Sequence, residues 1–300
     1  MFGVTILGNN SALPAYNRHP TAQVITLNDH LFLLDCGEGT QMQMNLYRIR
    51  RSRINHIFIS HLHGDHYFGL PGLITSYGLL GRSQELHLYA PSPLQNILDL
   101  VLNVSDTVLP YKLHFHPLEN ADMLVDEESF SVECFKVFHR IDCWGFQFRE
   151  KRKPRKINPD ATTKYNVPVE FFERLKQGED FIQDDKIISN EILTVPNKPS
   201  RSYAYSADTL YTESLAEKFQ NVNLLYHEAT YLNDNLDKAI SRFHSTSVQA
   251  ASLAKLAKVR KLILGHFSSK YEKLDEFLTE AKEVFPDTQL ALEGQTFLIT

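Results

Sequence analysis

Short runs of apolar and β-branched residues recur along the chain and predict strands. The runs at residues 23–27 and 31–34 flank a turn at Asn28 and Asp29, and therefore predict a hairpin. Residues 54–59 form a mostly apolar run rich in isoleucine and predict a buried strand. Further strands are expected at residues 4–7, 86–89, 113–115, 130–138, 224–228, 261–264 and 297–299, and before Asp208.

Apolar residues at helical spacing lie between these runs and predict helices. The helix expected at residues 42–49 has arginines at its C-terminal end, where the helix dipole favours cations. Thr246 and Gln249 have the spacing of a capping box at the start of another helix. Other helices are expected at residues 71–80, 94–104, 213–219 and 274–284. Strands that alternate with helices indicate an α/β protein whose site lies along one edge of its sheets.

The character of the chain changes between residues 146 and 202. Lys, Arg, Pro and Asn dominate there, apolar runs are short, and residues 167–175 are the only segment with a helical pattern. This composition indicates an insertion into the single domain formed by residues 1–300, and a solvated loop is the alternative.

Composition narrows the class of protein. The chain has 300 residues, of which 43% are hydrophobic and 22% charged, as is ordinary for a globular protein with a sizeable core. A net charge of −5 argues against nucleic-acid binding by the whole surface, but residues 48–53 and 149–156 are local basic patches. No run approaches the ~18 apolar residues of a membrane span, and the first residues predict a strand rather than a signal peptide. Because Cys36, Cys134 and Cys143 are widely spaced, reduced thiols and a cytoplasmic location are expected.

Four potential metal ligands follow the strand at residues 54–59: His61, His63, Asp65 and His66. Residues two apart in an extended segment face the same way, so His61 and His63 can bind one ion together. Gly64 allows a sharp turn that directs Asp65 and His66 toward a second point. A lone histidine after a strand is usually structural, but four such ligands suit Zn²⁺ and are too many for one tetrahedral ion. The spacing therefore predicts two metal ions.

Three further residues can complete such a centre, because His139, Asp208 and His266 each stand where a predicted strand gives way to a loop. The simplest partition gives one ion His61, His63 and His139, and the other Asp65, His66 and His266. Asp208 then bridges the two ions through its two oxygens.

The His-x-His-x-Asp-His segment resembles the signature of the metallo-β-lactamase superfamily, which implies metal-assisted hydrolysis. Over nearly its whole length the chain is also similar to the short form of the ribonuclease Z (tRNase Z) family, the tRNA 3′-end endonucleases. The matching segments are residues 34–41, 58–66, 68–73, 139–140, 206–209, 227–231, 244–246 and 265–271. The segments at 227–231 and 244–246 discriminate best, because the whole superfamily shares the metal ligands.

The resemblance implies a metallo-β-lactamase-like αβ/βα sandwich of two mixed sheets with outer helices, two Zn²⁺ per chain and a homodimer. It also implies a protruding arm at residues 146–202 that clamps the elbow of precursor tRNA. The cations there suit phosphate contacts: Lys151, Arg152, Lys153, Arg155 and Lys156. Residues 174–178 match the usual arm segment, whereas the Gly-Pro pair that precedes it in the family is absent.

The reaction implied is removal of the 3′ trailer from precursor tRNA, leaving a 3′-hydroxyl. Asp65 is expected to act as base or to orient the attacking water. By resemblance, His244 protonates the leaving 3′ oxygen and Glu228 holds its imidazole in the donating state. Asp35 is expected to shape a loop beside the metals.

Other functions could use the same metal ligands. A small-molecule phosphodiesterase or a thioester hydrolase would need neither the segments around Glu228 and His244 nor a basic arm. A β-CASP nuclease would need a much larger inserted domain. A non-catalytic RNA-binding metalloprotein, from a different class, would not need seven ligands together with a proton donor.

Overall fold

A computed structural model describes residues 1–300, and the chain divides into two compact units. The first unit comprises Met1–Asp126, Val132–Phe148 and Arg201–Thr300. The second comprises Glu127–Ser131 and Arg149–Ser200. None of the helices combines the length and the apolar character that crossing a membrane requires.

The first unit contains a seven-stranded sheet in the order β20-β1-β3-β4-β5-β6-β7. The half formed by β20, β1, β3 and β4 is antiparallel and includes the predicted hairpin of β3 and β4, whereas β4 to β7 run parallel. Parallel strands place their carboxyl ends at one edge of a sheet, and the loops that follow them therefore meet. The strands are β1 (Phe2–Gly8), β3 (Ala22–Leu27), β4 (His30–Leu34), β5 (Ile54–Phe58), β6 (Leu86–Ala90), β7 (Leu113–Pro117) and β20 (Thr296–Leu298).

A second seven-stranded sheet has the order β19-β17-β16-β15-β10-β9-β8, and its members β15, β16, β17 and β19 are parallel. Its strands are β8 (Asp122–Asp126), β9 (Phe130–Lys136), β10 (Trp144–Glu150), β15 (Ser202–Tyr205), β16 (Leu224–Glu228), β17 (Leu262–Gly265) and β19 (Thr288–Leu290). The short strands β2 (Asn10–Ser11) and β18 (Phe267–Ser268) pair with each other and link segments from opposite ends of the chain.

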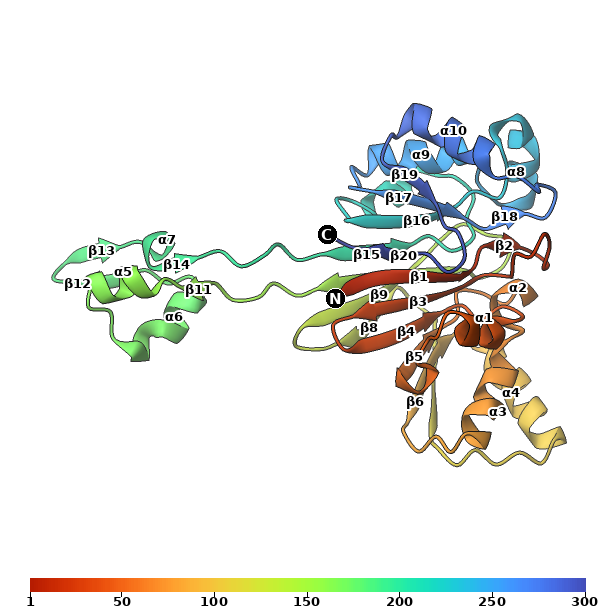
Figure 1. Ribbon diagram of the computed structural model, residues 1–300, viewed down its shortest axis with the longest axis horizontal. Coiled ribbons are helices and arrows are strands. Elements are labelled where there is room, and N and C mark those ends of the chain that lie inside the picture. The colour runs from red at the N-terminus through yellow and green to blue at the C-terminus, as the bar shows by residue number, and fades with distance from the viewer. The chain divides into compact units, whose positions relative to one another are not determined.

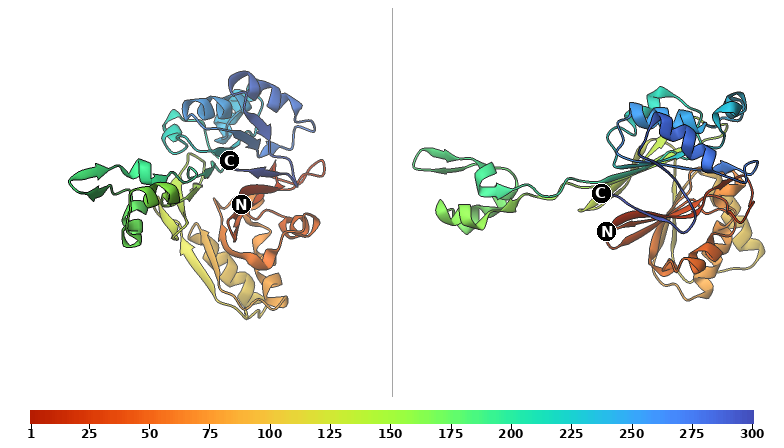
Figure 2. Two further views of the ribbon diagram at one scale, coloured as in Figure 1. Left: turned by 60° about the vertical axis from the view of Figure 1, so that its left-hand side comes forward. Right: turned by 45° about the horizontal axis from the view of Figure 1, so that its top comes forward.

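Helices cover the outer faces of both sheets (Figures 1 and 2). The first sheet carries α1 (Thr40–Leu46), α3 (Leu70–Leu79) and α4 (Pro93–Val104), with α2 (Gly64–Tyr67) and η1 (Arg51–Arg53) nearby. The second carries α8 (Leu236–Arg242), α9 (Ser247–Leu256) and α10 (Asp275–Val284), with η3 (Glu213–Glu217) and η4 (Asn233–Asn235). The predicted αβ/βα sandwich is confirmed, and its class is discussed below with the comparisons.

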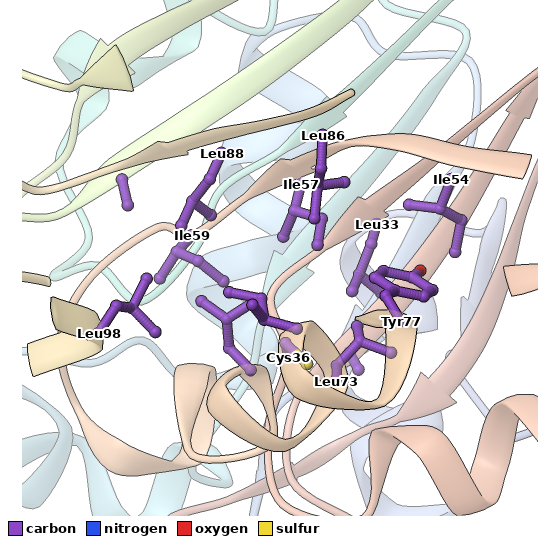
Figure 3. Close-up of a cluster of buried hydrophobic side chains, with 14 of the residues drawn as sticks. Leu33, Cys36, Ile54, Ile57, Ile59, Leu73, Tyr77, Leu86, Leu88 and Leu98 are labelled. Carbon is purple, nitrogen blue, oxygen red and sulfur yellow. The ribbon is translucent and has the colours of Figure 1, made fainter. Parts of the chain in front are cut away.

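Strand β5 shows why the sandwich holds together. Ile57 and Ile59 point into a cluster with Leu73 of α3 and Leu98 of α4 (Figure 3), while Phe58 on the opposite face meets the second sheet. The Phe58 ring lies 5.5 Å from Phe146 and 5.6 Å from Phe148, centroid to centroid. Each such buried side chain contributes about 1.5–3 kcal/mol of transfer free energy. Both faces of the strand that leads to the histidines are therefore anchored.

The second unit has a small core of its own, formed by Val167, Leu175 and Leu193. The alternative interpretation of residues 146–202 as a solvated loop is therefore wrong. The helix expected at residues 167–175 is confirmed as η2 followed by α6, but the expectation that it is the only helix of this segment is wrong, because other short elements surround this core. They are β11 (Lys156–Ile157), α5 (Pro159–Lys164), η2 (Val169–Phe171), α6 (Phe172–Lys176), β12 (Phe181–Gln183), β13 (Lys186–Ile188), α7 (Asn190–Leu193) and β14 (Thr194–Val195).

Most predicted elements of the first unit are confirmed, but there are differences, and the short strands β2, β8, β18 and β19 are among the elements that were not predicted. The first helix ends at Leu46, so the arginines from Arg48 onward lie beyond it rather than in its last turn. Strand β10 continues the second sheet to Glu150, so the first residues assigned to the insertion belong to that sheet. Helix α8 was not predicted. The capping box of Thr246 and Gln249 is present with both of its hydrogen bonds.

Candidate metal centre

The histidines and aspartates singled out in the sequence lie at one edge of the sandwich, after the carboxyl ends of four strands. His61, His63, Asp65 and His66 follow β5, and His139 follows β9. Asp208 follows β15, and His266 directly follows β17. The two sheets are joined at this edge, because the Trp144 amide donates to the Ser60 carbonyl oxygen at 3.0 Å.

The structure brings all seven predicted ligands into two groups. Ligand atoms of His61, His63, His139 and Asp208 lie within 4.8 Å of one another, and so do those of Asp65, His66 and His266. The Oδ2 atom of Asp208 is 3.6 Å from His61 Nε2 and 3.4 Å from His66 Nε2, and its Oδ1 atom is 3.3 Å from His266 Nε2. Asp208 therefore reaches both groups, as the partition from spacing predicts.

The donor set fits a pair of divalent cations. His61 Nε2 and His139 Nε2 each lie 3.1 Å from His63 Nδ1, and His66 Nε2 lies 3.3 Å from His266 Nε2. Asp208 Oδ1 is buried and accepts no hydrogen bond. Converging imidazole nitrogens and an unsatisfied buried carboxylate oxygen suit Zn²⁺. The residues present could thus hold the metal that this arrangement implies.

The far edges of four imidazoles are held by the protein. His66 Nδ1 is 2.8 Å from Asp35 Oδ2, His61 Nδ1 is 3.0 Å from Ser60 Oγ, and His266 Nδ1 is 2.9 Å from Thr230 Oγ1. His139 Nδ1 lies 2.9 Å from the Phe243 carbonyl oxygen. Such contacts select the tautomer that leaves Nε2 as an acceptor toward the centre.

Asp35 is the hub of the contacts behind the centre. The Ser60 amide, the Ser60 hydroxyl and the Tyr205 hydroxyl donate to its carboxylate at 2.7, 2.8 and 2.6 Å. The carboxylate is fully buried and still accepts from His66. Its expected place beside the metal ligands therefore has a physical reason: it orients both His66 and the loop that begins at Ser60.

Left-handed backbone marks three turns of the site. Asp35, Ala207 and His266 have φ angles of 54°, 53° and 59°, a region that residues other than glycine rarely adopt. Each lies just after a parallel strand, where the chain must turn sharply to direct a side chain toward the edge. Backbone strain of this kind is concentrated at functional sites.

Glu228 and His244 form a second arrangement beside the centre. The carboxylate of Glu228 lies 2.8 Å from His244 Nδ1 and accepts from the Thr209 amide at 2.8 Å and the Thr230 hydroxyl at 2.6 Å. Burial lowers the pKa of His244, but the Glu228 carboxylate outweighs burial and raises that pKa to about 9. Because Nδ1 is held by Glu228, Nε2 of His244 is left for a group in the adjoining pocket.

Burial and the charges of the centre together shift the pKa values of its groups in opposite directions. Burial lowers the pKa of His61 well below its ordinary value, and burial lowers that of His63 to about 4. Burial also opposes the charged form of His66, but the carboxylates of Asp208, Asp65 and Asp35 raise its pKa. For Asp65, the imidazoles of His66 and His266 outweigh burial and lower its pKa. Neutral imidazoles and ionised carboxylates are the forms that bind metal.

A pocket of about 360 Å³ opens onto this centre. Asp65, His244 and His266 line it, together with residues for which sequence reasoning gave no role. These are Ser11, Ala12, Phe68, Arg140, Tyr231 and Arg242. Arg140 and Tyr231 lie inside matching family segments and could have been found there, whereas no sequence signal marks Arg242.

The predicted RNA-contacting cations lie in the second unit, whereas the seven predicted metal ligands all belong to the first. Arg152, Lys153 and Lys156 are exposed. Arg155 is instead half-buried and donates from Nε to the Thr194 hydroxyl at 2.5 Å. The cysteines are as expected, since Cys36, Cys134 and Cys143 are free thiols.

Comparison with proteins of known structure identifies the class of the fold. A solved metallo-β-lactamase-fold protein, YhfI from Bacillus subtilis, superimposes with a TM-score of 0.71 at 19% identity, covering 99% of this chain and 100% of its own. The family model for Anti-Pycsar protein Apyc1 matches residues 2–150, and its match ends before Asp208. The two mixed sheets and the histidine–aspartate cluster at their edge define a protein of the metallo-β-lactamase fold, a class that binds metal.

More similar relatives identify the family. Proteins named Ribonuclease Z are 45% identical over 296 residues in Bacteroides fragilis strain YCH46 and 43% identical over 301 residues in Bacteroides thetaiotaomicron. These matches cover 98% and 99% of this chain, and 97% and 95% of the relatives. The crystal structure of human tRNase Z, short form (ELAC1), superimposes with a TM-score of 0.71 at 26% identity and covers 99% of both chains. This chain belongs to the ribonuclease Z family.

Asp35→Asn tests the support behind the centre. The amide keeps the size of the side chain but loses the negative charge that accepts from His66 and from three other donors. We expect metal affinity to fall about 10–100-fold, the usual cost of losing such a contact. Competition with a chromogenic chelator measures this directly. If affinity is unchanged while the variant is folded, Asp35 does not orient His66.

Proposed function

We propose that this protein is a metal-dependent endoribonuclease that cleaves the 3′ trailer from precursor tRNA and leaves a 3′-hydroxyl on the tRNA. The observation that carries the proposal is the Glu228–His244 pair beside a seven-residue histidine–aspartate cluster, in a chain 45% identical to a protein named Ribonuclease Z. The cluster alone would also suit a small-molecule phosphodiesterase, but the pair supplies a proton donor for a poor leaving group.

The metal assignment is part of this proposal. One Zn²⁺ would be held by His61, His63 and His139, and a second by Asp65, His66 and His266, with Asp208 shared. Two such ions supply Lewis acidity, which neutralises charge on phosphorus oxygens and lowers the pKa of a bound water toward ~7.

Asp65 orients the attacking water in this proposal. The Ala12 amide donates to Asp65 Oδ2 at 2.7 Å, which fixes the carboxylate at the mouth of the pocket. A fixed, ionised carboxylate can accept the hydrogen of the water and direct its lone pair toward phosphorus. The catalytic role of Asp65 thus depends on a contact from the first loop of the chain.

His244 donates a proton to the leaving 3′ oxygen, and Glu228 keeps the imidazole oriented and charged for that task. Four hydrogen bonds fix the Glu228 carboxylate, two of them from Thr230 and one from the Thr209 amide. A buried carboxylate held in this way stabilises an imidazolium and sets its direction. Proton donation to the 3′ oxygen leaves a 3′-hydroxyl on the tRNA.

The second unit is the proposed tRNA-binding arm. Arg152, Lys153 and Lys156 are exposed cations close together in sequence, and they suit phosphate contacts. The unit's own small core gives these cations a folded support.

A homodimer in the cytoplasm completes the proposal. Leu79, Leu100 and Val104 remain 89%, 63% and 78% exposed on α3 and α4, which supports contact with a second copy. Free buried cysteines support a reducing compartment.

Incubation of the purified protein with a 3′-extended precursor tRNA tests the function. We expect one cut near the 3′ end, a 3′-hydroxyl on the tRNA, loss of activity with a chelator and recovery with zinc. Metal analysis should find two zinc ions per chain. Cleavage of small phosphodiesters without cleavage of the precursor would favour the phosphodiesterase alternative.

His244→Ala tests the proton donor. We expect both metals to be retained and kcat on precursor tRNA to fall about 10²–10⁴-fold, the usual contribution of general acid catalysis. Since His244 also lies near Asp208 and His266, metal content must be measured alongside kcat. A matching loss of metal would make His244 a ligand instead. His114→Ala, in β7 and outside the pocket, is the control.

Alanine at Arg152, Lys153 and Lys156 together tests the arm. We expect a higher KM for precursor tRNA and a shallower salt dependence, by about one unit of slope per lost phosphate contact. Hydrolysis of a small phosphodiester should change far less. An equal loss on both substrates would show that the second unit does not bind RNA. Arg155 is retained because its contact with Thr194 is internal to that unit.

A further inference from the structure

Two arginines that the reaction does not use line the pocket beside the centre. Arg140 and Arg242 are both exposed, and neither pairs with a carboxylate. The contact that Arg140 makes is from Nη2 to His63 Nε2, at 3.0 Å. Guanidinium groups without an anionic partner, placed at the mouth of a pocket, suit a phosphate ligand.

The segments that carry these arginines, the loop after β9 and the C-terminal end of α8, are tied together. Arg140 follows His139, and Arg242 lies two residues before His244. The contact of His139 Nδ1 with the Phe243 carbonyl oxygen joins the two segments at 2.9 Å. Both guanidinium groups therefore start from backbone close to His244, on the side where the leaving oxygen would lie.

The tautomer that His63 would adopt when it binds metal leaves Arg140 free to bind a phosphate. Nδ1 of His63 faces His61 Nε2 and His139 Nε2, each at 3.1 Å, so His63 would bind metal through Nδ1. The ring proton then resides on Nε2, and a guanidinium, which has only donors, cannot bond to it. In the metal-bound protein Arg140 would therefore bind an anion rather than His63.

Phe68 offers an aromatic face at the same pocket. The ring is 63% exposed although it is large and apolar. Its inner side lies against Gly64, where an added Cβ would be 2.2 Å from the ring carbon Cε2. The glycine thus lets the ring lie on the backbone of the ligand loop, with the other side open. Exposed aromatic faces of this kind stack on unpaired bases.

We propose that this pocket is a subsite for single-stranded RNA next to the cleaved linkage. Arg140 and Arg242 bind the phosphates that flank the scissile phosphate, and Phe68 stacks on a neighbouring base. A volume of about 360 Å³ is at the small end for ligand pockets and suits about one nucleotide. The proposal rests on the proposed function and adds the residues that recognise the RNA around the cut.

Binding of two labelled RNAs tests the subsite in metal-loaded His244→Ala protein, which should bind without cutting. One RNA is a tRNA with its 3′ trailer, and the other is the same tRNA ending at the cleavage position. We expect Arg140→Ala and Arg242→Ala to weaken binding of the extended RNA more than that of the trimmed RNA. The slope of log Kd against log salt should fall by about 0.7 for each arginine.

Conservative variants separate recognition from folding. Arg140→Lys and Arg242→Lys should keep most of the salt slope, and Lys218→Ala, an exposed cation outside the pocket, should change nothing. Phe68→Leu should weaken binding of the extended RNA about tenfold, while Phe68→Tyr should retain it. Metal content, measured for every variant, should stay at the parent value.

Unchanged affinity and slope in the arginine variants would overturn the subsite, and so would an equal loss on both RNAs. Retained affinity in Phe68→Leu would remove the stacking face. Cleavage by the unmodified protein keeps the outcomes apart. If it cuts precursor tRNA while the variants bind like the parent, only the subsite fails. If it does not cut, the proposed function itself fails.

Discussion

The structure depends on a constraint at one edge of its sheets, where five imidazoles and two carboxylates converge. Asp208 lies at the centre of this group, fully buried, with its two oxygens directed toward different histidines. Nitrogen lone pairs and carboxylate oxygens so close together are costly to bury unless a cation or a shared proton lies between them. The rest of the sandwich must be rigid enough to hold the convergence, because a few tenths of an ångström decide whether ligands fit a metal.

Rigidity comes from the way each ligand is attached. Strand β5 is anchored on both faces, by isoleucines under α3 and α4 and by Phe58 against Phe146 and Phe148. Asp35 then holds the loop after β5 by two hydrogen bonds from Ser60 and orients His66. Hydrophobic packing thus positions the strand end, and a buried carboxylate positions the ring. Neither is sufficient alone, since packing has no directional preference and a hydrogen bond cannot place a strand.

The same edge divides into regions with different tasks. The histidine–aspartate cluster is largely buried and forms one side of the pocket, whereas the rest of the pocket carries His244, two arginines without a carboxylate partner and an open aromatic ring. Metal chemistry and recognition of RNA would therefore use adjoining but separate side chains. The second unit has its own core and exposed cations. It would add affinity for the RNA through residues that are remote in sequence from those that carry out the reaction. This separation suits an enzyme whose substrate is far larger than its reacting bond.

Local patterns in the sequence determined much of this protein. The short apolar and β-branched runs predicted the strands β3, β4 and β5, and the Thr246–Gln249 spacing predicted the start of α9, because both depend on neighbours within a few residues. The dense motif from His61 to His66 indicated two metals for the same reason. Strand β10 and the small core of the second unit escaped prediction, because their burial comes from contacts with distant segments. Only the tertiary structure decided that Ala12 holds Asp65 and that Arg242 faces the pocket. Those contacts join residues dozens to hundreds of positions apart, and the folding of both sheets onto a common edge brings them together.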